Sequence, residues 1–244
     1  MRTLAIDQGN TKTKWAVFEN QNLLFFENSD NLSLPALKRL ITSAKVSYVI
    51  LSSTRHLPKN MQRFFNMHTT YYLLTELLAF PFEIRYGSPN TLGKDRIAAV
   101  AGAWSRFPRQ NSLIIDAGSC ITYDLITREG LYLGGNISPG VHMRLNAMHH
   151  FTAKLPHVEP SSRYMAIGSD TVSALQTGAQ SGAIHEMTGF VQEYKRKFRK
   201  LNILLTGGDA HFFVNRMKTK IFAAPQLVLQ GLNEILNYNV QKDS

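Results

Sequence analysis

One pattern occurs twice in this chain and constrains its fold more than any other feature. "TLAIDQGNTKTKWAVF" near the start and "SLIIDAGSCITYDLI" near the middle each pass from an apolar strand through Asp, any residue and Gly into a second apolar strand. The aspartates, Asp7 and Asp116, lie about one domain length apart. One such hairpin is compatible with chance, but two that each open about half of the chain predict a duplicated domain. We therefore expect two domains, residues 1–112 and 113–244.

The segments that follow each hairpin alternate between strand and helix patterns. Helical spacing or capping signals predict helices over 33–44, from just after Gly93 to 107, and over 141–155, 169–198 and 225–239. Apolar runs predict strands over 46–53, before a glycine-rich turn in "LYLGGNISPG", and before the Gly-Gly turn of "LNILLTGGDAHFF". This alternation predicts the α/β class.

Composition fits a soluble globular protein and excludes several other classes. Of 244 residues, 44% are hydrophobic and 18% are charged. A single cysteine, Cys120, excludes an internal disulfide and fits a reducing compartment. The apolar runs are too short for a signal peptide or a membrane span. We expect a cytoplasmic protein without a membrane partner.

The charge balance favours anionic partners, phosphorylated small molecules included. The formal net charge is +10 and the isoelectric point is near 9.8. The densest basic cluster, "YKRKFRK" at 194–200, ends a predicted helix, where cations favour the helix dipole. This cluster therefore does not predict a nucleic-acid partner.

The first hairpin raises the question of what faces its aspartate. A tight turn explains Gly9 and Asn10, but a carboxylate at the end of an apolar strand needs a cation or donors. One answer is a capped hairpin in which Asp7 pairs with a lysine. The other is a phosphate site: Gly9 lets the backbone approach, Asn10 and Thr11 donate hydrogen bonds, Lys14 adds positive charge and Asp7 holds a divalent cation. The recurrence of the pattern favours the phosphate site.

These features resemble a known superfamily and one family within it. The two hairpins and the late "TGGDA" turn resemble the actin, sugar-kinase and heat-shock ATPase superfamily. That likeness implies two duplicated ribonuclease H-like domains with a nucleotide in the cleft between them. Type III pantothenate kinases are similar in more detail, through the ordered blocks "DQGNTKTK", "YGSPNTLGKDR", "DAGSCITYD", "GGNISPG", "TAKLP", "GSDTVSALQTGAQSG" and "TGGDA".

The resemblance implies an activity, cofactors and a partner. It implies ATP-dependent phosphorylation of pantothenate to 4′-phosphopantothenate, the first step of coenzyme A biosynthesis. The expected cofactors are ATP, a divalent cation such as Mg²⁺, and a monovalent cation, K⁺ or NH₄⁺. A homodimer is also implied, and the segment "GVHMRLNAMHHF" is our candidate interface.

The block "LGKDR" is expected to carry the catalytic base. From its residues alone it is the start of a helix with an acidic first turn. By resemblance, Asp95 accepts the proton of the substrate hydroxyl, while Gly93, Lys94 and Arg96 bind pantothenate. Tyr86 matches a substrate-contacting tyrosine upstream of this block.

The second half of the chain supplies the remaining expected site residues. By resemblance, Asp116 helps to bind the monovalent cation, and Ser119 stands where the family usually has an ATP-contacting threonine. Gly207 and Gly208 match the nucleotide-side loop, and Thr171 matches a substrate-contacting threonine. A plain strand-to-helix turn and a helix N-terminal hydroxyl explain these three residues equally well from sequence alone.

Two other functions remain open at this stage. One is a kinase of the same superfamily that acts on another small hydroxylated substrate. The other is a non-enzymatic accessory transcription regulator, which the positive charge would suit. A chain that had lost catalysis would be expected to lack Asp7, Asp95 or Asp116, and all three are present. The enzyme is therefore the favoured hypothesis.

Overall fold

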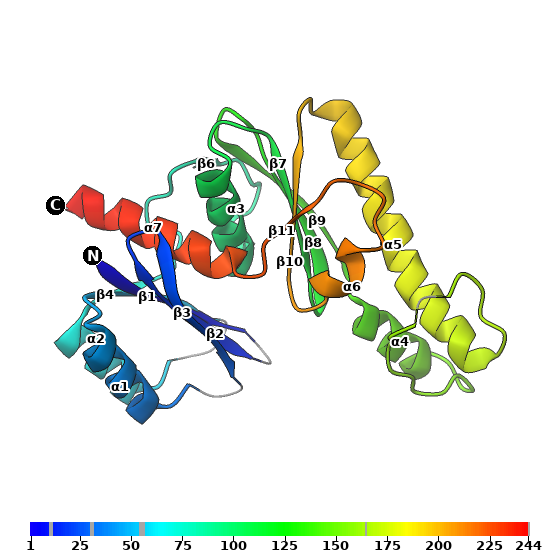
Figure 1. Cartoon of the computed structure of the whole chain (residues 1–244), viewed down its shortest axis with the longest axis horizontal. Helices are drawn as coiled ribbons and strands as arrows, with labels where there is room; N and C mark the ends of the chain where they lie inside the picture. Colours follow the sequence, from blue (N-terminus) through cyan, green and yellow to red (C-terminus); the bar gives the residue numbers. More distant parts are fainter. Residues whose placement is uncertain (10–11, 30–31, 54–56, 164, 244) are drawn as a thin grey trace. The chain divides into compact units, whose positions relative to one another are not determined.

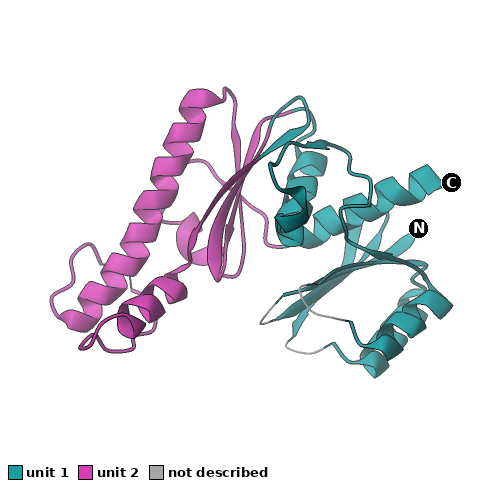
Figure 2. Ribbon diagram, turned by 180° about the vertical axis from the view of Figure 1, so that it is seen from behind, with its two compact units in different colours: residues 1–109, 127–133, 226–244 teal, residues 110–126, 134–225 magenta. Residues whose placement is uncertain are grey.

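The computed structural model describes residues 1–244 except 10–11, 30–31, 54–56, 164 and 244. By its internal contacts the chain forms two compact units, coloured separately in Figure 2. Unit 1 comprises residues 1–109, 127–133 and 226–244, and unit 2 comprises 110–126 and 134–225. The C-terminal segment thus returns to unit 1. The expected domain division at residue 112 stays a prediction.

Unit 1 is built on a five-stranded sheet that contains the first hairpin. Its order is β3-β2-β1-β4-β5, where β1 and β2 form the hairpin, β3 is antiparallel to β2, and β4 and β5 run parallel to β1. The strands are β1 (Arg2–Gln8), β2 (Thr13–Glu19), β3 (Asn22–Ser29), β4 (Tyr48–Ser53) and β5 (Thr70–Leu73).

Two helices cover one face of this sheet, α1 (Leu34–Ala44) and α2 (Lys59–His68) (Figure 1). The predicted helix over 33–44 is confirmed as α1. The side chain of Ser33 accepts a hydrogen bond from the Ala36 N–H, and the helix ends at Lys45 in the left-handed conformation. Leu37 and Ile41 of α1 join Leu4, Ile6 and other sheet residues in one buried core.

The other face of the sheet carries α7 (Leu227–Asp243), which packs on β1 and β4 and against α3 (Lys94–Arg106). Helix α3 begins directly after Gly93, as predicted. Every residue from 96 to 103 is buried, so the middle of α3 is enclosed on all sides. The two helices approach closely because Gly102 and Gly231 lie at the contact.

The second sheet contains the second hairpin and has the order β11-β10-β7-β8-β9-β6. Its strands are β6 (Glu83–Ile84), β7 (Ser112–Ala117), β8 (Cys120–Ile126), β9 (Leu131–Pro139), β10 (Asn202–Thr206) and β11 (Phe222–Ala223). Strand β6 and the first residues of β9 group with unit 1. The 3₁₀ turn η1 (Pro89–Thr91) precedes α3.

The helices of unit 2 are α4 (Val141–His150), α5 (Thr171–Lys197) and α6 (Ala210–Val214). Asp170 caps α5, and its side chain and that of Ser173 form a reciprocal capping box. Apolar residues of α4, α5 and α6 pack with β7, β8 and β10 in one core. None of the helices in the described parts of the chain is long and apolar enough to cross a membrane.

Two local predictions in unit 2 were wrong. Gly134 and Gly135 lie inside β9 rather than in a turn. Glycine is needed at position 135 because a side chain there would overlap the Tyr123 carbonyl of the hairpin's second strand. Helix α4 ends at His150 instead of continuing to 155. The downstream Pro156 disfavours helix there, and the Leu155 carbonyl is hydrogen-bonded to the His149 side chain at 2.7 Å.

Candidate active site

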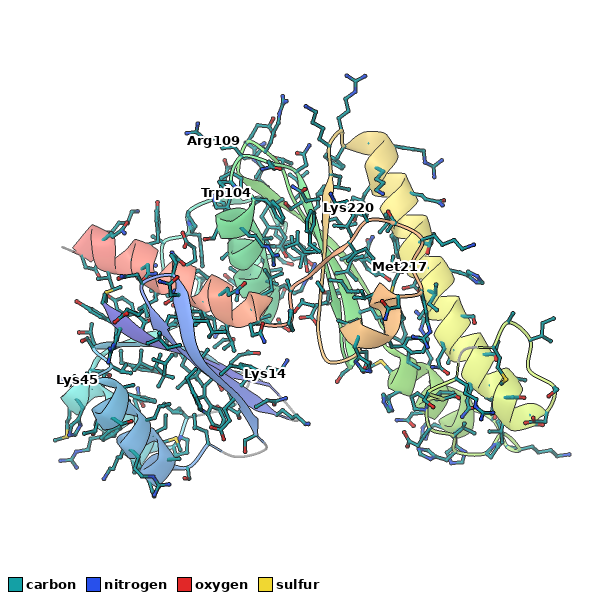
Figure 3. All side chains as sticks on the ribbon, viewed as in Figure 1. Lys14, Lys45, Trp104, Arg109, Met217 and Lys220 are labelled. Carbon is teal, nitrogen blue, oxygen red and sulfur yellow. The ribbon has the colours of Figure 1, made fainter. Side chains whose placement is uncertain are left out.

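The first hairpin brings Asp7, Lys14 and Ser52 together in unit 1. Asp7 is paired with Lys14 on β2 and with Ser52 on β4, so the three residues are lateral neighbours across three adjacent strands. Lys14 lies near the hairpin end of β2 (Figure 3). The buried Ser52 hydroxyl hydrogen-bonds to the Asp7 carboxylate. Sequence analysis did not single out Ser52, although it closes an apolar strand next to the hairpin.

Asp7 is a carboxylate in an unfavourable electrostatic position. Burial raises the pKa of Asp7 to about 6, and the nearby Asp95 carboxylate contributes to the rise. Lys14 and the Ser52 hydrogen bond lower the pKa of Asp7, but by less than burial raises it. A divalent cation would offset both the cost of ionising the buried Asp7 carboxylate and its repulsion from Asp95.

This pKa shift predicts how stability depends on pH. Asp7 takes up its proton more readily in the folded chain than in the unfolded chain, so its contribution to stability is full below pH 4 and is lost as pH rises to about 6. We expect Asp7→Asn to gain about 1–3 kcal/mol in unfolding free energy over wild type between pH 4 and pH 6.5. Urea denaturation without nucleotide or divalent ions measures this. A difference that stays constant with pH would contradict it.

The turn of the first hairpin is tight at Gly9. The Gly9 N–H donates to the Lys12 carbonyl at 3.1 Å, and a side chain at Gly9 would place its Cβ 3.3 Å from that oxygen. The predicted phosphate ligands Asn10 and Thr11 lie outside the described residues. The absence of a side chain at Gly9 therefore lets its backbone lie close to that of Lys12.

The start of α3 carries the expected base and a cationic neighbour. Asp95 is exposed in the first turn, and its Oδ1 accepts a hydrogen bond from the Arg96 N–H at 2.9 Å. Arg96 is only 5% exposed, and its guanidinium lies 5.7 Å from the centre of the Tyr86 ring. Lys94 is half-buried beside them. Unit 1 thus gathers Tyr86, Lys94, Asp95 and Arg96 around one helix start.

Gly93 sets the position of the Asp95 carboxylate. A Cβ at Gly93 would lie 2.6 Å from Asp95 Oδ1 and 3.4 Å from Arg96 Cδ, while the backbone φ of −56° suits any residue. We expect Gly93→Ala to displace the carboxylate and lower kcat roughly 10- to 100-fold, with a loss of at most about 1 kcal/mol in stability.

The matched control for this prediction is Gly87→Ala, because a Cβ there meets no atom within 4 Å. It should leave both kcat and the melting temperature unchanged. Steady-state kinetics and thermal unfolding of the two variants measure the effect. Full activity of Gly93→Ala would show that Gly93 does not determine where the carboxylate lies.

In unit 2 the second hairpin meets the turn after β10. Asp116 on β7 is paired with Thr206, the last residue of β10. Gly207 follows with a positive φ of 98°, and a Cβ there would lie 2.5 Å from Asp116 Oδ1 and overlap the Ala117 carbonyl. Only glycine fits this position without displacing the backbone. The neighbouring Gly208 is exposed.

Backbone hydrogen bonds from two glycines, Gly118 and Gly140, hold the tip of the same hairpin. The Gly118 N–H donates to the Cys120 carbonyl at 2.9 Å, which leaves Ser119 exposed at the tip. The Gly140 N–H, just before α4, donates to the Ser119 carbonyl at 3.0 Å. Unit 2 therefore brings Asp116, Ser119 and Gly207 together. Thr171 is exposed at the start of α5, and no contact among the described residues links it to Asp116.

Sequence analysis missed the network that holds the turn before α4. The Glu186 carboxylate on α5 accepts hydrogen bonds from the Tyr123 hydroxyl at 2.8 Å, from the Ser138 hydroxyl, and from Arg144 Nη2 at 2.5 Å. Arg144 Nε also donates to the Pro139 carbonyl at 2.8 Å. Burial raises the pKa of Glu186, but these donors outweigh it and lower the pKa overall. The ionised Glu186 side chain thus links α5 to β8, β9 and α4 through hydrogen bonds.

The carboxylates of the described residues are not arranged to hold a metal without further ligands. Within the described residues, no three His, Cys, Asp or Glu side chains form a group that could hold a metal ion. The carboxylate pair of Asp7 and Asp95 in unit 1 is instead suited to a cation that brings further oxygen ligands from a bound phosphate.

Several solved structures share this fold. In solved structures, a Campylobacter jejuni protein named as a candidate Baf family transcriptional activator matches with a TM-score of 0.59 at 20% identity, over 98% of this chain and 99% of that one. An activator of 2-hydroxyisocaproyl-CoA dehydratase from Clostridium difficile, with bound ADPNP, matches with a TM-score of 0.53 at 12% identity, over 100% and 98% of the two chains. Likenesses to this activator and to sugar kinases confirm the predicted α/β fold of actin-like ATPases.

Sequence relatives identify the family within that fold. A family model described as type III pantothenate kinase matches residues 3–193. The type III pantothenate kinase of Christiangramia forsetii is 42% identical over 247 aligned positions, which cover 97% of this chain and 98% of that protein. The chain therefore belongs to the type III pantothenate kinase family.

Proposed function

We propose that this protein is an ATP-dependent kinase that phosphorylates pantothenate to 4′-phosphopantothenate, the first step of coenzyme A biosynthesis. The acceptor is an alcohol group, so the reaction is a phosphoryl transfer between oxygens. The observation that carries the proposal is the family match over nearly the whole chain. The exposed Asp95 beside Asp7, Arg96 and Tyr86 gives that activity a chemical basis.

In this proposal the start of α3 binds and activates pantothenate. Asp95 accepts the proton of the attacking hydroxyl, which an exposed carboxylate at this position can reach. The substrate also carries a carboxylate, for which the Arg96 guanidinium is a natural partner. Gly93, Lys94 and Tyr86 line the same helix start. We assign Thr171 to pantothenate as well, on the resemblance alone.

ATP is the proposed phosphoryl donor. Asp7 would hold a divalent cation, Gly9 would admit a phosphate to the turn, and Lys14 would offset the charge that develops on it. Asn10 and Thr11 complete the proposed phosphate ligands. When bound, the cation neutralises charge on the phosphate oxygens during transfer. The raised pKa of Asp7 supports this assignment, because a bound cation would compensate the cost of its ionisation.

The second hairpin is proposed to contribute from unit 2. Asp116 would bind a monovalent cation, K⁺ or NH₄⁺, and Ser119 would contact ATP through its hydroxyl. Gly207 and Gly208 would form the nucleotide-side loop. The close fit of Gly207 against Asp116 supports a shared role for these two turns.

We further propose a cytoplasmic homodimer that uses α4 and the residues after it as its interface. Met143 is 42% exposed and Phe151 is 81% exposed, and such large apolar side chains favour burial against a partner. All three histidines of this segment, His142, His149 and His150, are exposed.

A coupled ADP-release assay tests the proposed function. With ATP and Mg²⁺ present, ADP release should require pantothenate and should be faster in potassium than in sodium buffer. If pantothenate stimulates no ADP release while other small alcohols do, the substrate assignment is wrong. If the rate is equal in the two buffers, the monovalent-cation assignment is wrong.

A further inference from the structure

The turn between β9 and α4 supports the tip of the second hairpin. The Gly140 N–H donates to the Ser119 carbonyl at 3.0 Å, and a Cβ at Gly140 would overlap the carbonyl oxygens of Gly118 and Ser119. Backbone therefore lies directly against backbone at this contact, with no side chain between them that could adjust. A shift of the Pro139–Gly140 turn would consequently shift the exposed Ser119 side chain as well.

The position of this turn depends on a single carboxylate, that of Glu186 on α5. Arg144 Nε donates to the Pro139 carbonyl at 2.8 Å, and Arg144 Nη2 donates to the Glu186 carboxylate at 2.5 Å. The Ser138 hydroxyl, at the end of β9, donates to the same carboxylate. One guanidinium thus bridges the turn and Glu186, so its orientation is fixed only when both acceptors are present.

The ion pair of Arg144 with Glu186 is better protected from solvent than the other ion pairs between described residues. The two side chains are 21% and 26% exposed, whereas both partners of every other pair are at least 39% exposed. Solvent and salt therefore screen it less. Burial raises the pKa of Glu186, but the hydrogen bonds to its carboxylate lower the pKa overall, which keeps the pair charged at neutral pH.

Glu186 reaches the second hairpin at two places without contacting its tip. Among the described residues, its carboxylate is hydrogen-bonded to Tyr123, Ser138 and Arg144, and none of these three belongs to the tip. Tyr123 is fully buried on β8, the second strand of the hairpin. Glu186 therefore ties that strand to α5 directly, and it reaches the tip only through Arg144 and the turn.

We infer that Glu186 is a positioning residue for the phosphoryl donor. Through Arg144 and the Pro139–Gly140 turn, it holds the hairpin tip where the Ser119 hydroxyl meets the bound nucleotide. This inference rests on the proposed contact between Ser119 and ATP, and it adds Glu186 and Arg144 as residues that act on that contact through the backbone. Their loss weakens ATP binding and leaves the pantothenate residues at the start of α3 unaffected.

The test measures ATP binding and turnover in Glu186→Gln and Arg144→Lys. Glutamine keeps the shape of the side chain without its charge, and lysine keeps the charge without the planar fork that bridges Glu186 and the Pro139 carbonyl. In both variants, KM for ATP and the calorimetric Kd for ATP without pantothenate should rise about 5- to 20-fold. KM for pantothenate and kcat at saturating ATP should change by about twofold or less, because a contact made equally in the ground and transition states affects KM alone.

Glu193→Gln is the matched control, because Glu193 lies on the same helix and pairs with Lys197 at the surface. It should bind ATP as wild type does. A second comparison is made in a Ser119→Ala background. Adding Glu186→Gln there should raise the Kd for ATP by about twofold at most, since the hydroxyl that Glu186 positions is already gone. A general structural role for Glu186 would instead give additive losses of ATP affinity.

The outcomes separate this inference from the proposed function. Pantothenate phosphorylation with an unchanged KM for ATP in both variants, or with equal rises in KM for both substrates, overturns the inference and leaves the proposed function standing. Weaker ATP binding in both variants, without turnover of pantothenate by wild type, supports the inference and overturns the substrate. No ATP binding by the folded wild-type protein overturns both. Urea denaturation checks folding, and Arg144→Lys alone decides the question if Glu186→Gln does not fold.

Discussion

Asp95→Asn is expected to lower kcat for pantothenate phosphorylation by about 10²- to 10⁴-fold, the range typical of a lost general base. The amide has nearly the shape of the carboxylate, and its oxygen can still accept the hydrogen bond from the Arg96 N–H. Asp95 is exposed at the helix start, so its replacement should change the unfolding free energy by about 1 kcal/mol or less. The predicted effect is therefore on chemistry rather than on folding.

Steady-state kinetics at saturating ATP and pantothenate, together with urea denaturation, measure both quantities. Glu129→Gln is the control, because Glu129 is an exposed acid of unit 1 paired with the adjacent Arg128. It should be active and stable. If Asp95→Asn retained more than a tenth of wild-type kcat, Asp95 would not be the base.

Gly231→Ala is expected to lower the free energy of unfolding by about 2–3 kcal/mol. A Cβ at Gly231 would overlap the Ala98 carbonyl of α3 and lie 2.7 Å from the Gly102 backbone nitrogen. Both neighbours are backbone atoms, so the two helices must move apart. Because α3 also carries Asp95, activity should fall together with stability.

A glycine-to-alanine substitution on α5 should have the opposite effect on stability. Gly189 is exposed in the middle of α5, and a Cβ there meets nothing within 4 Å. Gly189→Ala should therefore stabilise the protein by up to about 1 kcal/mol, since alanine favours helix more than glycine does. Urea denaturation of both variants measures the contrast. Wild-type stability in Gly231→Ala would contradict the close contact between α3 and α7.

Features encoded locally were predictable from the sequence. The hairpins at Asp7 and Asp116 follow from an apolar strand, a turn glycine and a second strand, all within one short segment. The start of α3 at Lys94 follows from its neighbours in the same way. The ordered blocks then led to the family, which the comparisons confirm.

Features that depend on contacts between distant segments were not predictable. Glu186 lies 63 positions from Tyr123 in the chain, so the periodicity of α5 gives no indication of their hydrogen bond. Gly135 suggested a turn, but its strand requires glycine because the Tyr123 carbonyl lies against it. Asp209 stood out only as part of a motif, and the pocket that it lines forms from α4, α5, α6 and a loop. A single sequence does not indicate which of its distant segments will lie in contact.

The most direct test of the central claim is mass spectrometry of the products after the purified protein is incubated with pantothenate, ATP, Mg²⁺ and K⁺. We expect pantothenate to gain one phosphoryl group, in an amount equal to the ADP released, and Asp95→Asn to yield far less product in the same time. Release of ADP without phosphorylated pantothenate, or no reaction with the folded protein, would contradict the assignment of this chain as a pantothenate kinase.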